Sequence, residues 1–510
     1  MNRDDEGRAY VPRRKRRHEQ PPPPSTESHD TKSLTDSLYE VSATQETSWA
    51  RQERGIVVDG EGSIPPPILS FSEFPLSSDA ILVLQSRGVT KPSAVQAQAL
   101  PCISQGRDVV VLAPTGSGKT LCYILPMLEL LQRLPYRSTE LEQYAAIPQI
   151  PTAPCALVVV PTRELADQVV QDFSEFFRDR TIPPVVGIYG GIAVAEQLLR
   201  LGKHAYDAMV VVATPGRLLH LLLHHRASLS LEQISLLVVD EVDRVLESPE
   251  METQLREILQ LANPAGRQTL LLSATLPVFL PRMARSAVLR PVTIRVDEAS
   301  MLSHNASVLS SGTRNTSAVK LALSTTSNVV HDVQFMRPAE KPSRLLRVLR
   351  TTKQPPVLVF CNSRASVERV ARLLRNEQFH AAPLHGGQSQ GYRTQALRAF
   401  RAGYVDVLVA TDLASRGLDF PGVMNVVLFD IPSTIEDYIH RCGRTGRHPG
   451  GDTGGSNVTG KATSFLTREC TIAMELKQVL RAALQSVPRE LDIPRNFGAS
   501  DTQASSSNNH

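Results

Sequence analysis

The chain contains an acidic segment, "VVDEVDRVL" at residues 238–246, whose side chains could hold a metal ion and activate water. Its carboxylates follow an apolar run of the kind that forms a buried strand. At such a position one carboxylate can bind a divalent cation, and a second can deprotonate the water that attacks a phosphate. Acids after a strand can also do no more than solvate a turn. The choice depends on whether the chain has a phosphate-binding segment as well.

A glycine-rich segment, "APTGSGKT" at residues 113–120, fits that requirement. It follows the apolar run "DVVVLA" and precedes "LCYILPMLELL", so we expect a strand, a loop and a helix. A loop of this kind presents main-chain N–H groups and the positive end of the helix to phosphate oxygens. Ala113 stands where the strict G-x-x-x-x-G-K-[ST] pattern has its first glycine. The predicted phosphate contacts are Thr115, Gly116, Ser117, Gly118, Lys119 and Thr120, with the Thr120 hydroxyl on Mg²⁺.

With a phosphate site in place, each acid gains a chemical role. We predict that Asp240 holds Mg²⁺, largely through water, and that Glu241 orients and deprotonates the attacking water. Lys119 is predicted to neutralise charge on the outer phosphates. Val242 adds apolar bulk without a donor, an acceptor or a charge. We therefore expect this valine to leave the chemistry unchanged.

Two series of short β-branched runs must position these side chains. The first series is "DVVVLA", "CALVVVP", "VVGIYGG", "MVVVATP", "SLLVVD" and "TLLLSAT". The second is "PVLVFCN", "HAAPLHG", "DVLVATD", "MNVVLFD" and "KATSFLT". The runs alternate with helical patterns, which is typical of parallel sheets built from βαβ units. The fold class predicted is α/β, with two parallel-sheet domains and a ligand cleft between them.

Composition sets the predicted domain boundaries. Residues 1–65 are rich in proline, serine, threonine and charge, and such a segment cannot bury enough apolar area to offset its ordering entropy. We predict disordered tails at 1–65 and 485–510. The first domain is predicted at 66–298 and the second at 329–484. The serine-, threonine- and asparagine-rich residues 299–328 are predicted to form a linker with an insertion.

The composition also limits the class of protein. Hydrophobic residues make up 41% of the 510 positions, and the net charge of +4 permits a phosphate-bearing partner without requiring one. No apolar run approaches the roughly 18 residues of a membrane span. The six cysteines form no CxxC pair, so we expect no zinc site and a reducing compartment. The start of the chain lacks a secretory pattern, and the basic run at 13–17 favours an intracellular, nuclear protein.

An ordered series of further motifs resembles the DEAD-box family of ATP-dependent RNA helicases across residues 71–470. In the first predicted domain the motifs are "GVTKPSAVQ" (88–96), "PTREL" (161–165), "GG" (190–191), "TPGRL" (214–218) and "SAT" (273–275). In the second they are "VFCNSR" (359–364), "HGGQSQGYR" (385–393), "ATDLASRGLD" (410–419) and "HRCGRTGR" (440–447). The resemblance implies two RecA-like domains. With valine in its acidic quartet, the chain resembles the plant subgroup called DEAD-box ATP-dependent RNA helicase 41.

The resemblance also implies a nucleotide site that both domains complete, with ATP and Mg²⁺ as cofactors. Outside the glycine-rich loop, it assigns these residues to the nucleotide: Phe71, Gln96, Gly417 and Asp419. Arg444 and Arg447, which we expect on one helical face, are the catalytic arginines from the second domain. An arginine finger contributes roughly 10³–10⁵ in rate. Hydrolysis is therefore expected to require closure of the two domains.

RNA is the implied partner, bound across both domains through its backbone. The implied RNA contacts are Arg163, Gly190, Gly191, Thr214, Gly216, Arg217, Arg364, Gly386, Arg393 and Thr411. Four residues are implied to couple the nucleotide to the RNA: Asp243, Ser273, Thr275 and His440. Backbone contacts carry little sequence information, so no sequence specificity is expected from the domains. We expect a monomer, with protein partners bound through the tails and no membrane contact.

Two functions fit these motifs. The leading interpretation is an RNA-dependent ATPase that acts as a non-processive RNA helicase and remodels RNA or RNA–protein complexes. The alternative is an ATP-gated clamp that holds a complex on RNA with little unwinding. The same residues would serve both functions, so the sequence leaves both open.

Val89 leads to a first testable prediction. It occupies a position in "GVTKPSAVQ" where many family members have an aromatic ring that stacks on adenine. Loss of that stacking weakens ATP binding by about 1–3 kcal/mol. We expect a high KM for ATP that falls in Val89→Tyr and Val89→Phe, measured by steady-state hydrolysis. An unchanged KM in both variants would show that this position does not contact the base.

Overall fold

The structure, a computed structural model, describes most of the chain between residues 47 and 492. The described ranges are 47–114, 116–133, 152–178, 184–202, 209–226, 228–262, 266–274, 287–296, 329–352, 355–412, 420, 422–446, 459–483 and 485–492. The predicted linker at 299–328 and the basic run at 13–17 lie outside these ranges.

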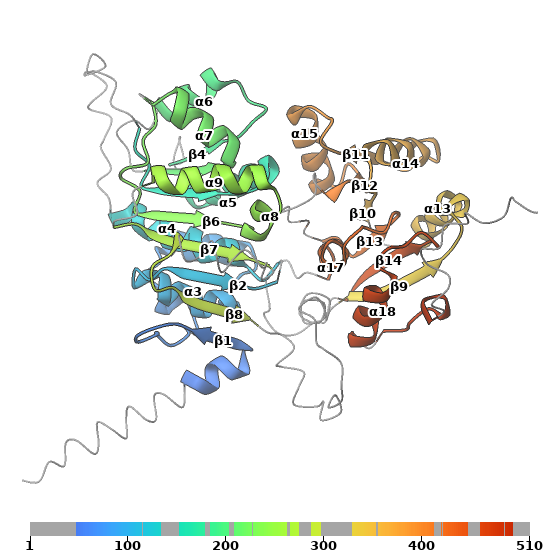
Figure 1. Cartoon of the computed structure of the whole chain (residues 1–510), viewed down its shortest axis with the longest axis horizontal. Helices are drawn as coiled ribbons and strands as arrows, with labels where there is room; N and C mark the ends of the chain where they lie inside the picture. The colour runs from blue at the N-terminus through green and yellow to red at the C-terminus, as the bar shows by residue number, and fades with distance from the viewer. Residues whose placement is uncertain are drawn as a thin grey trace, which may run out of the picture. The chain divides into compact units, whose positions relative to one another are not determined.

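The first domain is built on a sheet with eight strands in the described residues. They are β1 (Ile56–Asp59), β2 (Val109–Leu112), β3 (Ala156–Val159), β4 (Val185–Ile188), β5 (Val210–Ala213), β6 (Leu236–Val239), β7 (Gln268–Ser273) and β8 (Val292–Val296). Their order is β1-β8-β2-β7-β6-β3-β5-β4. Figure 1 labels this sheet from the blue β1 through β8, β2 and β7 to β6, with β4 beyond. All neighbours are parallel except β1 and β8.

Helices cover both faces of this sheet. They are α2 (Ser78–Ser86), α3 (Ala94–Ser104), α4 (Lys119–Arg133), α5 (Arg163–Ser174), α6 (Val194–Gly202), α7 (Pro215–His224), α8 (Val242–Leu246) and α9 (Pro249–Leu261). Alternate side chains of β2 enter two different apolar clusters, with Val109 and Val111 in one and Val110 in the other. Side chains of one strand that point to opposite faces of a sheet require this division. Both faces are therefore buried, as parallel sheets require.

The second domain is a parallel sheet of six strands within the described residues. They are β9 (Val329–Phe335), β10 (Val357–Phe360), β11 (Ala381–Leu384), β12 (Val407–Ala410), β13 (Asn425–Leu428) and β14 (Gly460–Leu466), in the order β11-β12-β10-β13-β14-β9 (Figure 1). The helices are α13 (Lys341–Thr351), α14 (Arg364–Asn376), α15 (Gln390–Arg401), α17 (Ile435–Cys442) and α18 (Ala473–Ala482). The predicted α/β fold with two parallel-sheet domains is confirmed. In the described part of the chain, no helix is both long and apolar enough to cross a bilayer.

The predicted tails are too long at both inner ends. Residues 47–53 are helical and β1 follows, although 1–65 was predicted to be disordered. The reason is that β1 pairs antiparallel with β8 and buries Ile56 in the core. At the other end a short 3₁₀ helix, Arg489–Asp492, falls within the predicted tail at 485–510, and its Leu491 is buried. At both ends, the burial of a few apolar side chains stabilises a segment that its polar average composition predicts to be disordered.

The strand order groups the motifs by function. β7 lies between β2 and β6, so the glycine-rich loop, the "SAT" segment and the acidic quartet leave three neighbouring strands. β3, β5 and β4 form the other end of the sheet, and the "PTREL", "TPGRL" and "GG" segments follow them. In a parallel sheet all carboxyl ends share one edge, where ligands bind. One edge of the first sheet therefore holds the predicted nucleotide contacts at one end and the predicted RNA contacts at the other.

The second sheet contains a buried histidine close to the helix that leads into "GRTGR". His331 on β9 is 3% exposed, and its Nδ1 lies 3.0 Å from the hydroxyl of Tyr438 on α17. The Ser464 hydroxyl donates to the same tyrosine oxygen at 3.4 Å. Burial lowers the pKa of His331 to about 4 from the ordinary value of 6.5. His331 is therefore neutral in the folded protein at neutral pH.

This burial predicts a loss of stability in mild acid. Between pH 6.5 and pH 4 the unfolded chain binds a proton at His331 that the folded protein excludes, so the free energy of unfolding falls as the pH falls. The contribution of this residue is about 3 kcal/mol. His331→Gln should have a shallower dependence of stability on pH over this interval, measured by urea unfolding. His380→Gln is the matched control, because His380 is 74% exposed; equal slopes in the two variants would contradict the prediction.

Candidate nucleotide and RNA site

The glycine-rich loop connects β2 to α4, as its sequence predicts. Gly116 and Gly118 have φ angles of 86° and 89°, a region that glycine occupies without steric cost. The loop folds around its own lysine: Nζ of Lys119 donates to the carbonyls of Ala113 at 2.6 Å and Pro114 at 2.8 Å. The lysine is 8% exposed. A buried ammonium group thus lies within the loop, where phosphate oxygens can replace carbonyls as its partners.

Asp240 leaves β6 close to that lysine. Its carboxylate is 4% exposed and accepts hydrogen bonds from the Tyr123 hydroxyl at 2.9 Å and the Glu241 N–H at 2.8 Å. Burial raises the pKa of Asp240, and Lys119 is the largest opposing influence. The Tyr123 hydroxyl therefore holds one of the two predicted Mg²⁺ ligands, Asp240. Sequence reasoning missed Tyr123, although it lies one helical turn after Lys119 on α4.

Glu241 is held in an unusual state. Its φ of 49° is left-handed, which is strained for a residue with a side chain and recurs at functional sites. Its buried Oε2 has no hydrogen-bond partner among the described residues. Burial raises the pKa of Glu241 to about 7, with Arg444 as the first opposing influence, while Asp240 and Asp243 raise it further. A carboxyl group whose pKa lies near neutrality is suited to accept a proton from water.

The donor set fits Mg²⁺ bound together with a nucleotide. Hydroxyl and carboxylate oxygens, as on Thr120 and Asp240, are the ligands that Mg²⁺ prefers. The described residues contain no group of three His, Cys, Asp or Glu side chains that could hold a metal. Mg²⁺ usually keeps several waters and binds one or two carboxylates plus substrate phosphates. Thr120 and Asp240 would therefore hold the ion with the phosphates, and the ion would supply charge neutralisation.

The structure brings the third acid to the "SAT" segment. Oδ2 of Asp243 accepts a hydrogen bond from the Ala274 N–H at 3.1 Å, and Ser273 beside it is fully buried. The contact is made through the main chain of the segment. Val242 is also fully buried, in the apolar cluster that includes α8 and α9. It therefore packs under the site without offering it a polar group, in agreement with the expectation from sequence.

The segment predicted to bind adenine contacts the phosphate loop. Gln96 is 2% exposed; its Nε2 donates to the Gly118 carbonyl at 3.0 Å, and its Oε1 accepts from the Ser93 N–H at 3.0 Å. A Cβ on Gly118 would collide with this amide, which explains the glycine. Phe71 is buried in the core of the first domain, and Val89 packs partly buried against the same core. Contact of these side chains with adenine stays a prediction.

The predicted RNA contacts of the first domain lie together. The guanidinium of Arg163 lies against Gly190 and Gly191, so close that a Cβ on Gly190 would be 2.6 Å from its Nη2. Nη1 of Arg217 donates to the Ile192 carbonyl at 2.8 Å, directly after that pair. The remaining members, Thr214 and Gly216, flank the first residue of α7. Loops after β3, β4 and β5 thus form one surface.

The second domain brings three of its predicted RNA contacts close together. Arg364 begins α14 and its side chain lies beside Gly387, next to Gly386. The Thr411 N–H donates to the Leu384 carbonyl at 3.2 Å, which places it beside the same loop. Arg393, on α15, pairs with a residue of the first domain, and its contact with RNA stays a prediction.

Arg393 is buried in an ion pair with a residue that sequence reasoning did not assign. Its Nη2 lies 2.6 Å from Oε1 of Glu164 in "PTREL", and the two side chains are 8% and 3% exposed. Gln390 donates to the same oxygen at 3.0 Å. The pairing follows from burial, because a guanidinium removed from water requires a carboxylate partner. These residues connect the predicted RNA surfaces of the two domains.

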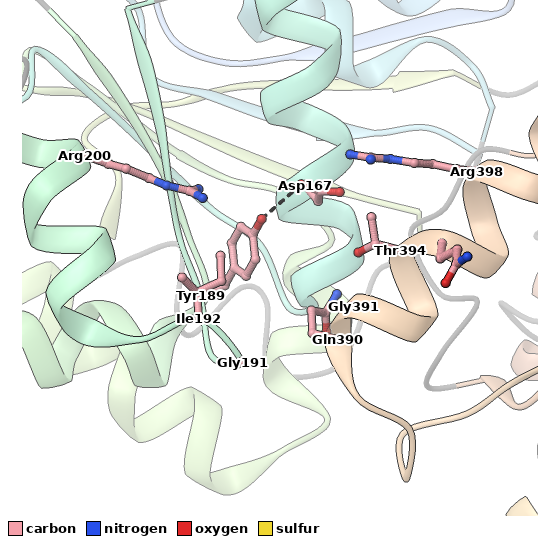
Figure 2. A pocket seen from close by; sticks show the side chains of 10 residues that line it. Asp167, Tyr189, Gly191, Ile192, Arg200, Gln390, Gly391, Thr394 and Arg398 are labelled. Carbon is pink, nitrogen blue, oxygen red and sulfur yellow. Dashed lines mark hydrogen bonds between the residues drawn. The ribbon is translucent and has the colours of Figure 1, made fainter.

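A cavity of about 620 Å³ borders this connection. Figure 2 shows its lining, in which the Tyr189 hydroxyl donates to Asp167 at 3.0 Å. Arg200 and Arg398 also line it, from α6 and α15. The cavity includes Gly191 but none of the predicted nucleotide contacts. It therefore belongs to the predicted RNA side of the molecule.

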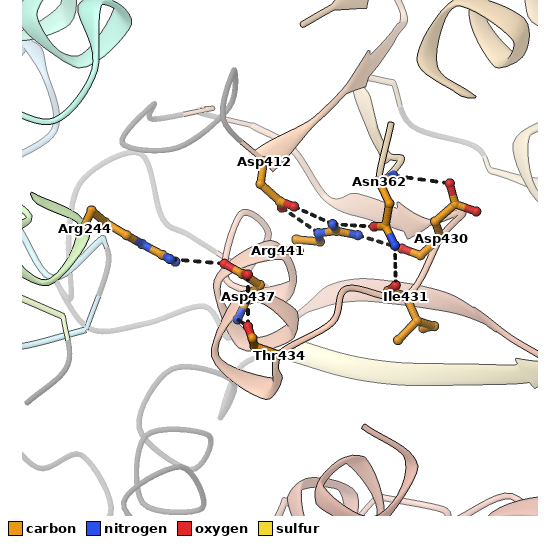
Figure 3. Close-up of polar contacts among 8 residues, drawn as sticks. All are labelled: Arg244, Asn362, Asp412, Asp430, Ile431, Thr434, Asp437 and Arg441. Carbon is orange, nitrogen blue, oxygen red and sulfur yellow. Dashed lines mark hydrogen bonds and ion pairs between the residues drawn. The ribbon is translucent and has the colours of Figure 1, made fainter. Parts of the chain in front are cut away.

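Arg441 organises the end of the second sheet and was missed from sequence. It is 2% exposed and pairs through both Nε and Nη2 with Asp412, at 2.6 and 2.5 Å (Figure 3). It also donates to Asn362 and to the Asp430 carbonyl. The helix α17 ends at Cys442, so Arg444 lies in the turn that follows. The expectation that Arg444 and Arg447 share a helical face is therefore wrong for Arg444. The helix has its last residue at Cys442 and its C-cap at Gly443, so it ends before Arg444.

An ion pair connects the acidic quartet to α17. Arg244, directly after the quartet, lies 3.1 Å from Oδ1 of Asp437 in the first turn of α17 (Figure 3). It also pairs with Glu247 at 2.6 Å within its own domain. The side chains of Arg244 and Asp437 are 7% and 16% exposed. His440, a predicted coupling residue, lies buried in the same helix.

Five of the assigned residues lie outside the described part of the chain. They are Thr115, Thr275, Gly417, Asp419 and Arg447. Their roles stay predictions.

Comparisons with known proteins agree with this geometry. The sequence profile of the DEAD/DEAH box helicase family matches residues 93–282, and that of the helicase conserved C-terminal domain matches 340–449. DEAD-box ATP-dependent RNA helicase 35 of Arabidopsis thaliana is 36% identical over 448 residues, which cover 86% of this chain and 67% of that protein. The chain belongs to the DEAD-box family of ATP-dependent RNA helicases. Similarity to the helicase 41 subgroup stays a prediction.

Two further comparisons show what share of a similar protein's length the chain covers. The Dictyostelium discoideum protein called ATP-dependent RNA helicase ddx41 is 37% identical over 456 residues, 87% of this chain and 60% of that protein. The chain thus spans about 60% of the length of this curated relative. The structure of S. cerevisiae Dbp5 bound to RNA and ADP BeF3 aligns with a TM-score of 0.62 at 23% identity, over 82% of this chain and 95% of that one. This likeness establishes the two-domain DEAD-box fold.

The Arg244–Asp437 pair predicts a coupling between the quartet and α17. Asp437→Asn and Arg244→Met should each lower RNA-stimulated kcat about tenfold, because each removes the ion pair that joins the quartet to α17. The double variant should be no worse than either single variant, a coupling of about 1–2 kcal/mol. Glu247→Gln, which removes only the pair within one domain, is the control. Purely additive losses, or an equal loss in Glu247→Gln, would show that the pair does not couple the two elements.

Proposed function

We propose that this protein is an RNA-dependent ATPase that acts as a non-processive RNA helicase and remodels RNA or RNA–protein complexes. The observation that carries the proposal is the ion pair of Arg244, directly after the acidic quartet, with Asp437 on α17 of the second domain. Arg444 follows α17 in the second domain, yet it is the first influence that lowers the pKa of the proposed general base in the first. A hydrolysis site made from both domains can respond to RNA bound across them.

The charges at this site support hydrolysis driven by electrostatics and positioning. ATP phosphates would bind the main chain of the glycine-rich loop and Lys119, with Mg²⁺ near Thr120 and Asp240. Glu241 would accept a proton from the attacking water. Arg444 would stabilise the charge that develops on the transferred phosphoryl group, which is the main requirement of phosphoryl transfer.

RNA would reach this site through two connections. Arg163, Arg217 and the paired glycines offer main-chain and guanidinium donors of the kind that bind phosphates. The Glu164–Arg393 pair connects this surface to the second domain, and Arg244–Asp437 connects the acidic quartet to α17. RNA that favours these interdomain contacts also favours the complete ATP site. Linkage requires the reverse, so ATP strengthens RNA binding.

An ATP-gated RNA clamp is the second candidate. The buried pair of Arg393 and Glu164 favours it, because a closed state held by buried ion pairs could be long-lived. In a clamp, ATP hydrolysis releases RNA and unwinding is incidental. Strand displacement and release rates separate the two functions.

We propose a monomer whose tails bind protein partners. The basic run at 13–17 supports a nuclear location.

The decisive measurement compares duplex displacement with RNA release. A helicase of this type should separate a short RNA duplex with ATP, leave a long duplex intact, and hold RNA in a non-hydrolysable ATP analogue. Glu241→Gln should lower RNA-stimulated hydrolysis by about 10²–10⁴-fold, since it removes the proton acceptor, while ATP and RNA still bind. The same variant should trap RNA complexes for crosslinking in cells.

Glu252→Gln is the matched control for this measurement. It makes the same carboxylate-to-amide change on α9, where Glu252 pairs with Arg256. Its hydrolysis should equal that of the wild type. Hydrolysis by Glu241→Gln at the wild-type rate would reject the catalytic assignment. RNA retention in ATP without displacement of a short duplex would favour the clamp.

A further inference from the structure

The helix α3 lies directly against the phosphate loop. Its first turn carries Gln96, whose Nε2 donates to the Gly118 carbonyl at 3.0 Å. Ser93, the N-cap residue of α3, donates from its hydroxyl to the Ser117 carbonyl at 2.8 Å. Any shift of α3 along or across its axis would therefore change the contact between Gln96 and the loop.

The chain before α3 completes the hydrogen bonding of this helix. Pro101 lies inside α3 and has no N–H group, so the Ala97 carbonyl lacks its donor within the helix. The Ile68 N–H takes that place and donates to Ala97 at 2.9 Å. A second contact lies at the helix start, where Nη1 of Arg54 reaches the Pro92 carbonyl at 3.4 Å. The chain before α3 is thus bound at Pro92 and at Ala97, which lie before and after Gln96 in the sequence.

A third contact closes this arrangement around a buried glutamine. Gln98 is fully buried, and its Oε1 accepts from Nε of Arg51 at 2.8 Å. Its Nε2 and Nη2 of Arg51 both donate to the Pro65 carbonyl at 2.9 Å. We name the three residues Arg51, Gln98 and Pro65 the N-terminal clasp. Beside a weak bond to Cys102 within the helix, the Gln98 amide has its partners in Arg51 and Pro65, so Gln98 depends on the segment at 51–65.

Helical geometry places the clasp opposite the phosphate loop. Gln96 and Gln98 are two residues apart, which is about 200° around an α-helix. One face of α3 therefore contacts the loop through Gln96, and the other is held by the clasp. None of the predicted nucleotide contacts lies in residues 47–65. This segment contacts α3 through Arg51 and Pro65 without contributing a predicted nucleotide contact of its own.

We propose that Arg51 and Gln98 are positioning residues for nucleotide binding, and that the N-terminal clasp holds α3 in register with the phosphate loop. This inference rests on the proposed ATPase function, with Gln96 as the side chain that distinguishes adenine. Loss of the clasp leaves Lys119, Asp240 and Glu241 in place. Nucleotide affinity and the preference for ATP over GTP then fall, while the chemical step at saturating ATP is retained.

The test compares Arg51→Ala with Arg107→Ala in the full chain. Arg107 also holds the N-terminal segment, through the carbonyls of Glu61 at 2.6 Å and Ser63 at 3.3 Å, but it does not contact Gln98. Equilibrium binding of fluorescent ATP and GTP analogues is measured beside steady-state hydrolysis and thermal unfolding. Arg51→Ala should raise the Kd and KM for ATP about 3- to 10-fold, the effect of one or two lost hydrogen bonds, and reduce the ATP preference. Its kcat should stay within about twofold.

The control variants separate positioning from general destabilisation. Arg107→Ala should keep the wild-type ATP preference even if it unfolds at a lower temperature. Arg51→Lys, which keeps the charge but cannot make both contacts, should lie between the wild type and Arg51→Ala, and it carries the test if Arg51→Ala does not fold. Gln98→Met should repeat the Arg51→Ala effect.

The possible results distinguish failure of the clasp proposal from failure of the proposed function. Wild-type nucleotide affinity and preference in Arg51→Lys and Gln98→Met would overturn the clasp proposal. Equal losses of affinity in Arg51→Ala and Arg107→Ala would also overturn it. A wild-type protein that binds ATP without RNA-stimulated hydrolysis would refute the proposed function alone, because the binding measurements still test the clasp. A wild-type protein that binds no nucleotide would refute both.

Discussion

Parallel pairing of β2, β7 and β6 is the constraint on which the rest of the site depends. Parallel strands end at one edge of a sheet, so the loops that follow these three strands must lie side by side. The buried lysine of the first loop thus acts electrostatically on the buried carboxylate of Asp240, and it opposes the rise that burial causes in the pKa of that carboxylate. The "SAT" segment follows the strand between them. A buried charge is costly unless an opposite charge or hydrogen bonds compensate it. The sheet order therefore determines the electrostatics of the site as well as its shape.

The second domain supplies what the first lacks. The first domain places Asp240, Glu241 and Asp243 within one turn, and this crowding of like charges together with burial raises the pKa of Glu241. Arg444 opposes that rise from the second sheet, and Arg441 holds the segment before it through Asp412 and Asp430. A site divided in this way is complete only when both sheets contribute. Under the proposed function, this division would let RNA bound elsewhere influence hydrolysis.

Much of the fold and of the nucleotide site could be predicted from sequence. The apolar runs predicted both sheets, and the glycine-rich loop with its acidic quartet predicted Lys119, Asp240 and Glu241, because these patterns depend on neighbours along the chain. The contacts that were missed join residues distant in sequence. Tyr123 on Asp240, Arg441 on Asp412 and Glu164 on Arg393 are examples, separated by 117, 29 and 229 positions. The inner ends of the tails failed for the same reason, since β1 is stabilised by β8.

The sequence by itself determined which chemical groups are available: a glycine-rich loop with a lysine, neighbouring carboxylates, and basic residues for which RNA contacts are predicted. These assignments rest on residue type and spacing, because local backbone geometry places residues that are close in the sequence. Only the tertiary structure decided which of these groups are buried, and burial sets the charge state of Glu241, the pairing of Arg393 and the dependence of Gln98 on the N-terminal segment. Burial depends on every element that packs around a residue, so it arises only when distant parts of the chain come together.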